Sequence, residues 1–383
     1  MKKTLALLTA VMLFLAPALS LAADLRFTTD VIRAFDSLYL GEYNDAPIEW
    51  LVVRNNLTST NSIGLFLITR NLLDSLTWDG YEYKTSNLSA ACTRVYDYSF
   101  NPVEKNRILQ TTTKDAADYE RLDNFWYVFP APLSQASVFL LSMKEIESYL
   151  PPQYREGESV WYMRNDMRYD AALGIMLCEG TRWTWLANTS NSWSCGFRPG
   201  MNINLDGAAY ITPAMDGKDD TPGLAPIAPQ DGVTAWKLTL DAKKTFSAKV
   251  SKTVYSDDRT VEIDVTAPYG YRDICCILME MNGEATHYGL VATQNGKATF
   301  TLPEELPNGT YGLMLFGEQR NGDNRTDFMT TQVLTSVTLT DRPAVTPTPS
   351  VPATGDGAPL TLLALLGICS AAALLLLRKR AMR

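Results

Sequence analysis

The sequence predicts a multidomain protein with an α+β N-terminal head, a following all-β sandwich, a signal peptide and a C-terminal transmembrane segment. Three observations support this fold class. Long apolar runs lie near both ends, seven of the eight tryptophans precede residue 212, and short alternating apolar runs follow residue 232. A length of 383 residues allows two or three domains at ~100–200 residues each.

Composition narrows the function classes. The formal net charge is −8, whereas a nucleic-acid-binding protein needs a basic surface. The single histidine, His287, excludes multi-histidine metal sites and leaves at most one histidine-based nucleophile arrangement. We therefore expect no nucleic-acid partner and no metal site. Because no recognisable catalytic motif is present, we also expect no cofactor, no catalytic residue and no enzymatic activity.

The N-terminus has the three parts of a secretory signal peptide. Lys2 and Lys3 precede a short apolar run, and small residues end at Ala23. The run is short for a membrane span of ~20 residues. We interpret residues 1–23 as a signal peptide and expect the protein to be exported.

Residues 24–211 mix strand and helix patterns and form the predicted head. Apolar runs at 48–53, 63–69 and 138–142 indicate strands. Ser142 with Glu145 three residues later predicts a capped helix over 143–150. A second helix is expected around 102–110.

The head resembles an uncharacterised family of bacterial extracellular domains and, more distantly, the C-type-lectin-like and formylglycine-generating-enzyme-type fold. The resemblance is carried by Leu40-Gly41-Glu42-Tyr43, Pro47-Ile48-Glu49-Trp50-Leu51-Val52, Phe100, Glu104-Lys105, Ile108-Leu109, Val138-Phe139-Leu140-Leu141-Ser142, Trp161-Tyr162-Met163-Arg164 and Gly196-Phe197-Arg198-Pro199. It implies a fold and no chemistry.

Aromatic residues concentrate near the end of the head. If residues around 183–185 form a strand, Trp183 and Trp185 share one face. Flat aromatic rings stack on sugars, but they also fill ordinary cores. We hypothesise a platform for a glycan or for a host or matrix protein, with a packing role as the alternative, formed by Trp161, Arg182, Trp183, Trp185 and Trp193.

The cysteines leave one disulfide hypothesis. Cys178 and Cys195 flank a predicted hairpin, and an exported chain can oxidise such a pair. Two buried thiols are the alternative, because sequence does not show whether the Cα atoms lie within ~7 Å.

Residues 212–231 are rich in proline and aspartate and are interpreted as a linker. Beyond them, Val261, Ile263 and Val265 alternate with polar residues, which indicates a strand with one wet face. Similar runs occur at 235–241, 273–280, 286–292, 297–302, 310–317 and 331–340. Seven or so strands over 232–340 are typical of an immunoglobulin-like sandwich.

This second domain is similar to a repeat module of Gram-positive surface proteins. The matching residues are Tyr288-Gly289, Gly309-Thr310-Tyr311, Phe316-Gly317-Glu318-Gln319, Asn321-Gly322-Asp323 and Thr326-Asp327. The resemblance implies a spacer beside other extracellular domains.

Residues 341–354 form a Pro/Thr-rich stalk, and an uncharged apolar run at 358–377 precedes a basic tail. Twenty such residues can span a bilayer, and the tail favours the cytoplasmic side. A plain transmembrane anchor is one interpretation.

Residues 351–383 also resemble the cell-wall sorting signal of Gram-positive surface proteins, in which Leu-Pro-x-Thr-Gly precedes an apolar span. The matching pentapeptide is Val351-Pro352-Ala353-Thr354-Gly355, with Val351 in place of leucine. The resemblance implies that a sortase cleaves after Thr354 and joins its carboxyl group to peptidoglycan. The partners would be sortase, peptidoglycan and, before sorting, the membrane.

The sequence thus favours a cell-surface protein of a Gram-positive bacterium, anchored to peptidoglycan and presenting a binding or adhesion head. Two alternatives stay open. One is a surface hydrolase acting on glycans, because carboxylate pairs leave no spacing signature. The other is a membrane-retained structural surface protein.

Overall fold

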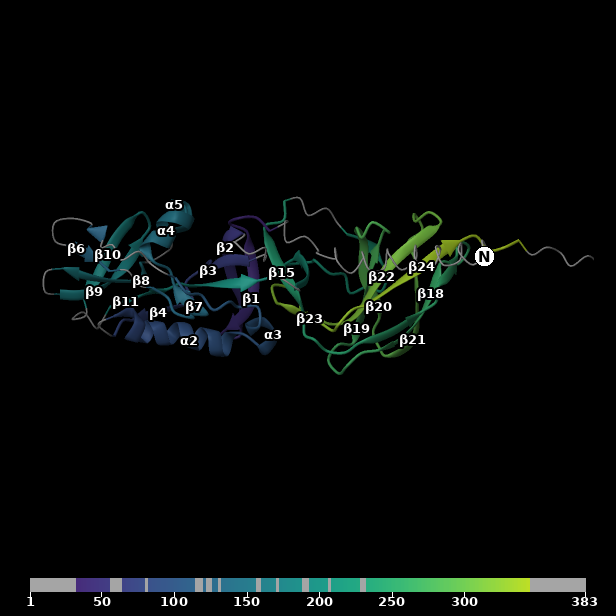
Figure 1. The fold of residues 1–383 in the computed structure, drawn as a ribbon, viewed down its shortest axis with the longest axis horizontal. Coiled ribbons are helices and arrows are strands. Elements are labelled where there is room, and N and C mark those ends of the chain that lie inside the picture. The colour runs from purple at the N-terminus through teal and green to yellow at the C-terminus, as the bar shows by residue number, and fades with distance from the viewer. Residues whose placement is uncertain are drawn as a thin grey trace, which may run out of the picture. The chain divides into compact units, whose positions relative to one another are not determined.

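The protein is mainly β-structure, which agrees with the predicted all-β sandwich. The computed structural model describes residues 32–55, 64–79, 82–113, 120–121, 126–129, 132–155, 160–169, 172–187, 193–205, 208–227 and 232–344. Within these ranges, far more residues lie in strands than in helices (Figure 1).

Three sheets contain the strands of these ranges. The first has the order β14-β20-β19-β22-β23-β15-β1-β2-β3-β12-β7, with β13 on β15, β24 on β22 and β17 on β24. Its members are β1 (Ser37–Tyr43), β2 (Ala46–Asn55), β3 (Gly64–Thr69), β7 (Val138–Leu140), β12 (Pro199–Asn204), β13 (Ala208–Pro213), β14 (Ala225–Pro226), β15 (Ala235–Asp241), β17 (Thr253–Tyr255), β19 (Asp273–Met279), β20 (Ala285–Ala292), β22 (Gly309–Gln319), β23 (Asp327–Met329) and β24 (Val333–Thr340).

The second sheet lies in the head and has the order β10-β9-β8-β11-β4, with β6 on β8 and β5 on β6. It contains β4 (Asp74–Thr77), β5 (Glu120–Arg121), β6 (Trp126–Val128), β8 (Trp161–Tyr169), β9 (Ala172–Glu179), β10 (Arg182–Ala187) and β11 (Ser194–Phe197). The third sheet contains β16 (Ser247–Val250), β18 (Thr260–Thr266) and β21 (Gly296–Thr301).

Helices cover both faces of the strands in the head. Residues at helical spacing on α2 (Asn87–Ser99) share one core with Trp50 and Val52 of β2. Leu51 and Val53 point the other way and join the core of α4 (Met143–Tyr149). Figure 1 shows α2 on one side of these strands and α4 with α5 (Pro152–Arg155) on the other.

Capping explains where two of the helices begin. Ser142 and Glu145 form the reciprocal capping box that the sequence predicts for α4. The helix expected around 102–110 is shorter, because α3 (Pro102–Lys105) ends and Ile108 then pairs with Ile203. A three-residue 3-10 helix, η2 (Tyr83–Thr85), precedes α2.

The predicted strands of residues 235–340 are confirmed. On β18, Val261, Ile263 and Val265 are buried while the residues between them are exposed. These three pack against apolar residues of β19 and β22, so two layers enclose one core. Gly283 and Gly296 have φ values of 89° and 108°, as tight Asn-Gly turns require.

Strand β15 joins the strands on its two sides into one hydrogen-bonded sheet. It pairs in parallel with β1 through Leu38–Trp236 and with β23 through Leu240–Phe328. The Trp236 indole donates to Asp36 Oδ2 at 2.8 Å. The sequence boundaries put residues 232–340 in a second domain, yet Trp236 and Leu238 pack in the core shared with β1 and β2.

The terminal predictions lie outside the described residues. These are the signal peptide at 1–23, the pentapeptide at 351–355 and the apolar span at 358–377. In the part of the chain that the structure describes, no helix is long and apolar enough to cross a membrane.

Candidate functional site

The structure divides the predicted aromatic platform between core and surface. Trp161 is completely buried on β8. Trp183 and Trp185 share one face of β10, as predicted, and are half-buried against the same core as Trp161. Trp193 is 67% exposed.

Two arginines lie over tryptophan rings of this core, one over the buried Trp161 and one over the half-buried Trp183. The Arg198 guanidinium lies 5.3 Å from the ring centroid of Trp161, and that of Arg155 lies 5.7 Å from Trp183. Cys178 stands between Trp161 and Trp183 in the strand register. These rings therefore have a packing role, which is the alternative that the sequence left open.

Trp193 and Arg182 are the exposed members of the predicted platform. Because β11 runs parallel to β8, Trp193 lies at the same end of the sheet as Arg182 at the start of β10. Strands β8 and β9 separate them. Trp193 is therefore the most exposed ring that a ligand at this end would meet.

The disulfide hypothesis for Cys178 and Cys195 is wrong in this structure, where both are free, buried thiols. Cys178 packs in the core beneath α4, whereas Cys195 packs in the core beneath α2. The two side chains therefore lie on opposite faces of the sheet. Burial raises the pKa of Cys178 to about 12, which keeps this thiol protonated and unreactive at neutral pH.

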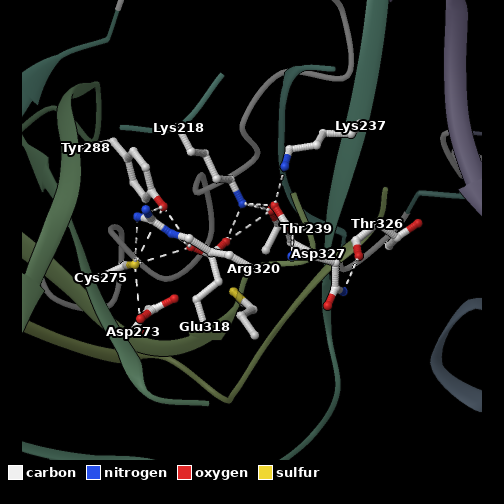
Figure 2. Close-up of polar contacts among 12 residues, drawn as sticks. Lys218, Lys237, Thr239, Asp273, Cys275, Tyr288, Glu318, Arg320, Thr326 and Asp327 are labelled. Carbon is white, nitrogen blue, oxygen red and sulfur yellow. Dashed lines mark hydrogen bonds and ion pairs between the residues drawn. The ribbon is translucent and has the colours of Figure 1, made fainter. Parts of the chain in front are cut away.

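Sequence reasoning missed a buried polar cluster beside β15, which we call the Lys218 cluster (Figure 2). Its members are Lys218, Lys237, Thr239, Cys275, Tyr288, Glu318, Arg320 and Asp327. The Lys218 side chain is only 3% exposed, and those of Glu318 and Asp327 are completely buried. Ionised groups are rarely buried this deeply unless they are paired.

Asp327 lies between two lysines. Lys218 Nζ donates to Asp327 Oδ2 at 2.5 Å, and Lys237 Nζ contacts the same oxygen at 2.9 Å (Figure 2). The backbone N–H of Asn321 donates to Oδ1 at 2.7 Å. Lys237 is held in place by Gly322, whose carbonyl oxygen accepts from Nζ at 2.8 Å.

Glu318 occupies the other side of Lys218. Its Oε1 accepts from Lys218 Nζ, which also donates to Thr239 Oγ1 at 2.7 Å. Oε2 accepts from the Tyr288 hydroxyl at 2.7 Å and from Arg320 Nε at 3.2 Å. The Cys275 thiol donates to the same oxygen at 3.2 Å.

Neighbouring charges keep Glu318 and Lys218 ionised in spite of their burial. Burial alone would raise the pKa of Glu318, but Lys218 and Arg320 outweigh it and lower that pKa to about 2. Burial would lower the pKa of Lys218, but Glu318 and Asp327 raise it. Burial and then Glu318 raise the pKa of Cys275, so the thiol stays neutral.

The cluster thus combines a buried amine, two buried carboxylates and a backbone donor. Such groups can stabilise the fold as a network or exchange protons along direct contacts. In the sequence, Lys218 lies in the predicted linker and Glu318 and Asp327 lie in the predicted spacer. The charges of Glu318 and Asp327 next to apolar strand residues were the available signal, and Lys218 offered none.

No protein-family model matches the chain, and no match was found among curated proteins. Among solved structures, the chain is similar to a "Biofilm associated protein - BSP domain" at 10% identity and a TM-score of 0.19. The match covers 85% of this chain and 54% of that one, so the chain spans about half of its length.

Proposed function

We propose that this is an exported surface protein of a Gram-positive bacterium, joined to peptidoglycan by a sortase and presenting its N-terminal head for binding. The observation that carries the proposal is the order of the segments. A signal peptide precedes the folded part, and a stalk, a pentapeptide, an apolar run and a basic tail follow it.

The compact unit of the structure fits this order of segments along the chain. The compact unit ends at Asp341, directly after β24 and at the first residue of the predicted Pro/Thr-rich stalk. The pentapeptide therefore comes later in the sequence than β24, the last strand of the described residues. In this proposal, residues 232–340 act as an immunoglobulin-like spacer, and the continuous pairing through β15 couples it to the strands of residues 32–213.

Changing Thr354 to alanine is expected to move the protein from the wall fraction to the membrane fraction. The sortase would lack the residue whose carboxyl group it transfers, and the apolar span would keep the chain in the membrane. Immunoblots of separated wall and membrane fractions measure the shift. An unchanged wall fraction would refute covalent anchoring at Thr354, and Thr346→Ala in the stalk is the matched control.

Binding by the head is expected to depend on Trp193. An exposed tryptophan at the centre of an interface contributes strongly, so Trp193→Ala should weaken binding about 10–100-fold. The assay is an array of glycans and matrix proteins probed with the mature chain, followed by titration of each positive signal.

Tyr98→Ala is the control for this experiment, because Tyr98 is 85% exposed on a different element, α2. It should leave binding unchanged. A flat array at high protein concentration would contradict the binding proposal, and equal affinities for the wild type and Trp193→Ala would remove Trp193 from the site.

A further inference from the structure

The Lys218 cluster places an amine against two carboxylates where bulk water is absent. Lys218 Nζ contacts Glu318 Oε1 on one side and Asp327 Oδ2, at 2.5 Å, on the other. All three side chains are at most 3% exposed. Figure 2 shows the amine directed at both acids.

We propose that Lys218 and Asp327 become joined by an intramolecular amide bond between Nζ and Cγ, with Glu318 relaying the protons. The proposal rests on the geometry of the cluster and is independent of sortase anchoring. The Lys218 cluster is then a site at which the protein modifies itself covalently.

Asp327 is the better acceptor of the two acids. Its Oδ1 already accepts from the Asn321 backbone N–H at 2.7 Å, which is where negative charge develops when an amine attacks Cγ. Its Oδ2, the oxygen that must leave, faces two lysine ammonium groups. Glu318 Oε2 is instead held by the Tyr288 hydroxyl and by Arg320 Nε, while its Oε1 faces Lys218 and can take the proton of the ammonium.

Lys218 is the better nucleophile of the two lysines. It lies closer to Asp327 Oδ2 than Lys237 does, at 2.5 Å against 2.9 Å, and it contacts a second carboxylate that can take its proton. Lys237 donates to the carbonyl oxygen of Gly322, which cannot accept a proton in this way.

The reaction balances without any added reagent. Glu318 takes one proton from the Lys218 ammonium, and the neutral amine attacks Asp327 Cγ. The N–C bond forms, the Cγ–Oδ2 bond breaks, and two of the three ammonium protons leave with Oδ2 as water. One of these two protons is delivered through Glu318. The third ammonium proton stays on the amide nitrogen, and nothing is oxidised or reduced.

The surroundings favour this step. The Lys218 ammonium lies 4.9 Å from the ring centroid of Tyr210, whose ring packs 5.2 Å from that of Tyr288. These two tyrosines also line a cavity of about 340 Å³. Groups held this close react at high effective molarity, and the amide removes two buried charges whose desolvation is costly.

The bond would tie the segment after β13 to β23 across 109 residues. It would close a covalent loop that contains β15 and most of the following strands. Such a closure resists unfolding, as a disulfide does, and needs no cysteine.

Mass spectrometry of the mature full-length protein tests the proposal. After denaturation and tryptic digestion, the peptides containing Lys218 and Asp327 are expected as one branched species lighter by one water. Cleavage after Lys218 should be absent. Separate peptides with normal cleavage after Lys218 would overturn the proposal, and fragment ions that join Lys218 to Glu318 would overturn the choice of acceptor.

Variants separate the roles of the residues. Lys218→Arg keeps the positive charge and Asp327→Ala removes the acceptor, so both should yield only unlinked peptides. Glu318→Gln should lose at least nine-tenths of the link while a thermal melt shows that the chain is folded. Asp220→Asn, a matched control at an exposed partner of Arg320, should keep the link. A full link in Glu318→Gln would overturn the proton relay.

Discussion

Replacing Glu318 with alanine is expected to lower the free energy of unfolding by about 3–5 kcal/mol. The substitution removes the buried acceptor of Arg320 and Tyr288, and in any molecule whose Lys218 is not joined to Asp327 it also leaves that ammonium with one carboxylate partner. An uncompensated buried charge costs more than the pair contributes when it is intact. Chemical denaturation of the mature chain, followed by tryptophan fluorescence, measures the loss.

Asp220 provides the matched control for Glu318. It also binds Arg320, at 3.0 Å, but its side chain is 94% exposed. Asp220→Ala should therefore change stability by no more than about 0.5 kcal/mol. Equal effects of the two substitutions would contradict the assignment of Glu318 as a buried, paired charge.

The lowered pKa of Glu318 predicts that the free energy of unfolding depends on pH. Because the folded-state pKa of Glu318 is about 2, below its ordinary value of 4.5, its stabilising contribution is complete above pH 4.5. The contribution is lost as the pH falls from 4.5 through about 2. The stability difference between wild type and Glu318→Ala should therefore shrink over this interval.

Replacing Trp236 with alanine is expected to cost about 3–5 kcal/mol as well. Trp236 is completely buried on β15, and its indole donates to the buried Asp36. The substitution removes a large ring from the core formed with β1 and β2, and it also removes one of the two hydrogen bonds to Asp36 Oδ2, leaving the one from the Arg33 backbone N–H. The same denaturation assay measures the effect.

Two comparisons make the Trp236 result specific. Trp236→Phe keeps most of the ring volume and should cost only about 1–3 kcal/mol, largely from the lost hydrogen bond. Trp193→Ala changes an exposed tryptophan and should stay within about 0.5 kcal/mol. A Trp236→Ala protein as stable as wild type would contradict a core that includes β15.

The sequence predicts strands well where one face of the sheet is exposed to solvent. The alternation at 260–266 and the turn glycines after Asn282 and Asn295 determine local structure without distant partners. The capping box at Ser142 is equally local and is found as predicted. Helix α2 was missed because Thr93, Val95 and its aromatic residues weaken intrinsic helix propensity, although Leu88, Ala91, Cys92 and Val95 have helical spacing.

The candidate site is less predictable because it depends on distant partners. Lys218 meets Glu318 and Asp327 across 100 and 109 residues, from a segment whose composition indicates a linker. The free state of Cys178 and Cys195 likewise follows from which sheet face each occupies. Trp161 and Trp193 belong to the same hypothesised platform, yet the structure places Trp161 in the core and Trp193 in solvent.

The C-terminal residue of the wall-released protein tests the central claim most directly. Muramidase should release the protein from purified cell walls, and mass spectrometry should identify its last peptide. Sortase anchoring predicts a chain that ends at Thr354 and carries a peptidoglycan fragment on that carboxyl group. A chain that continues through Gly355 to Arg383, extractable with detergent alone, would contradict the account.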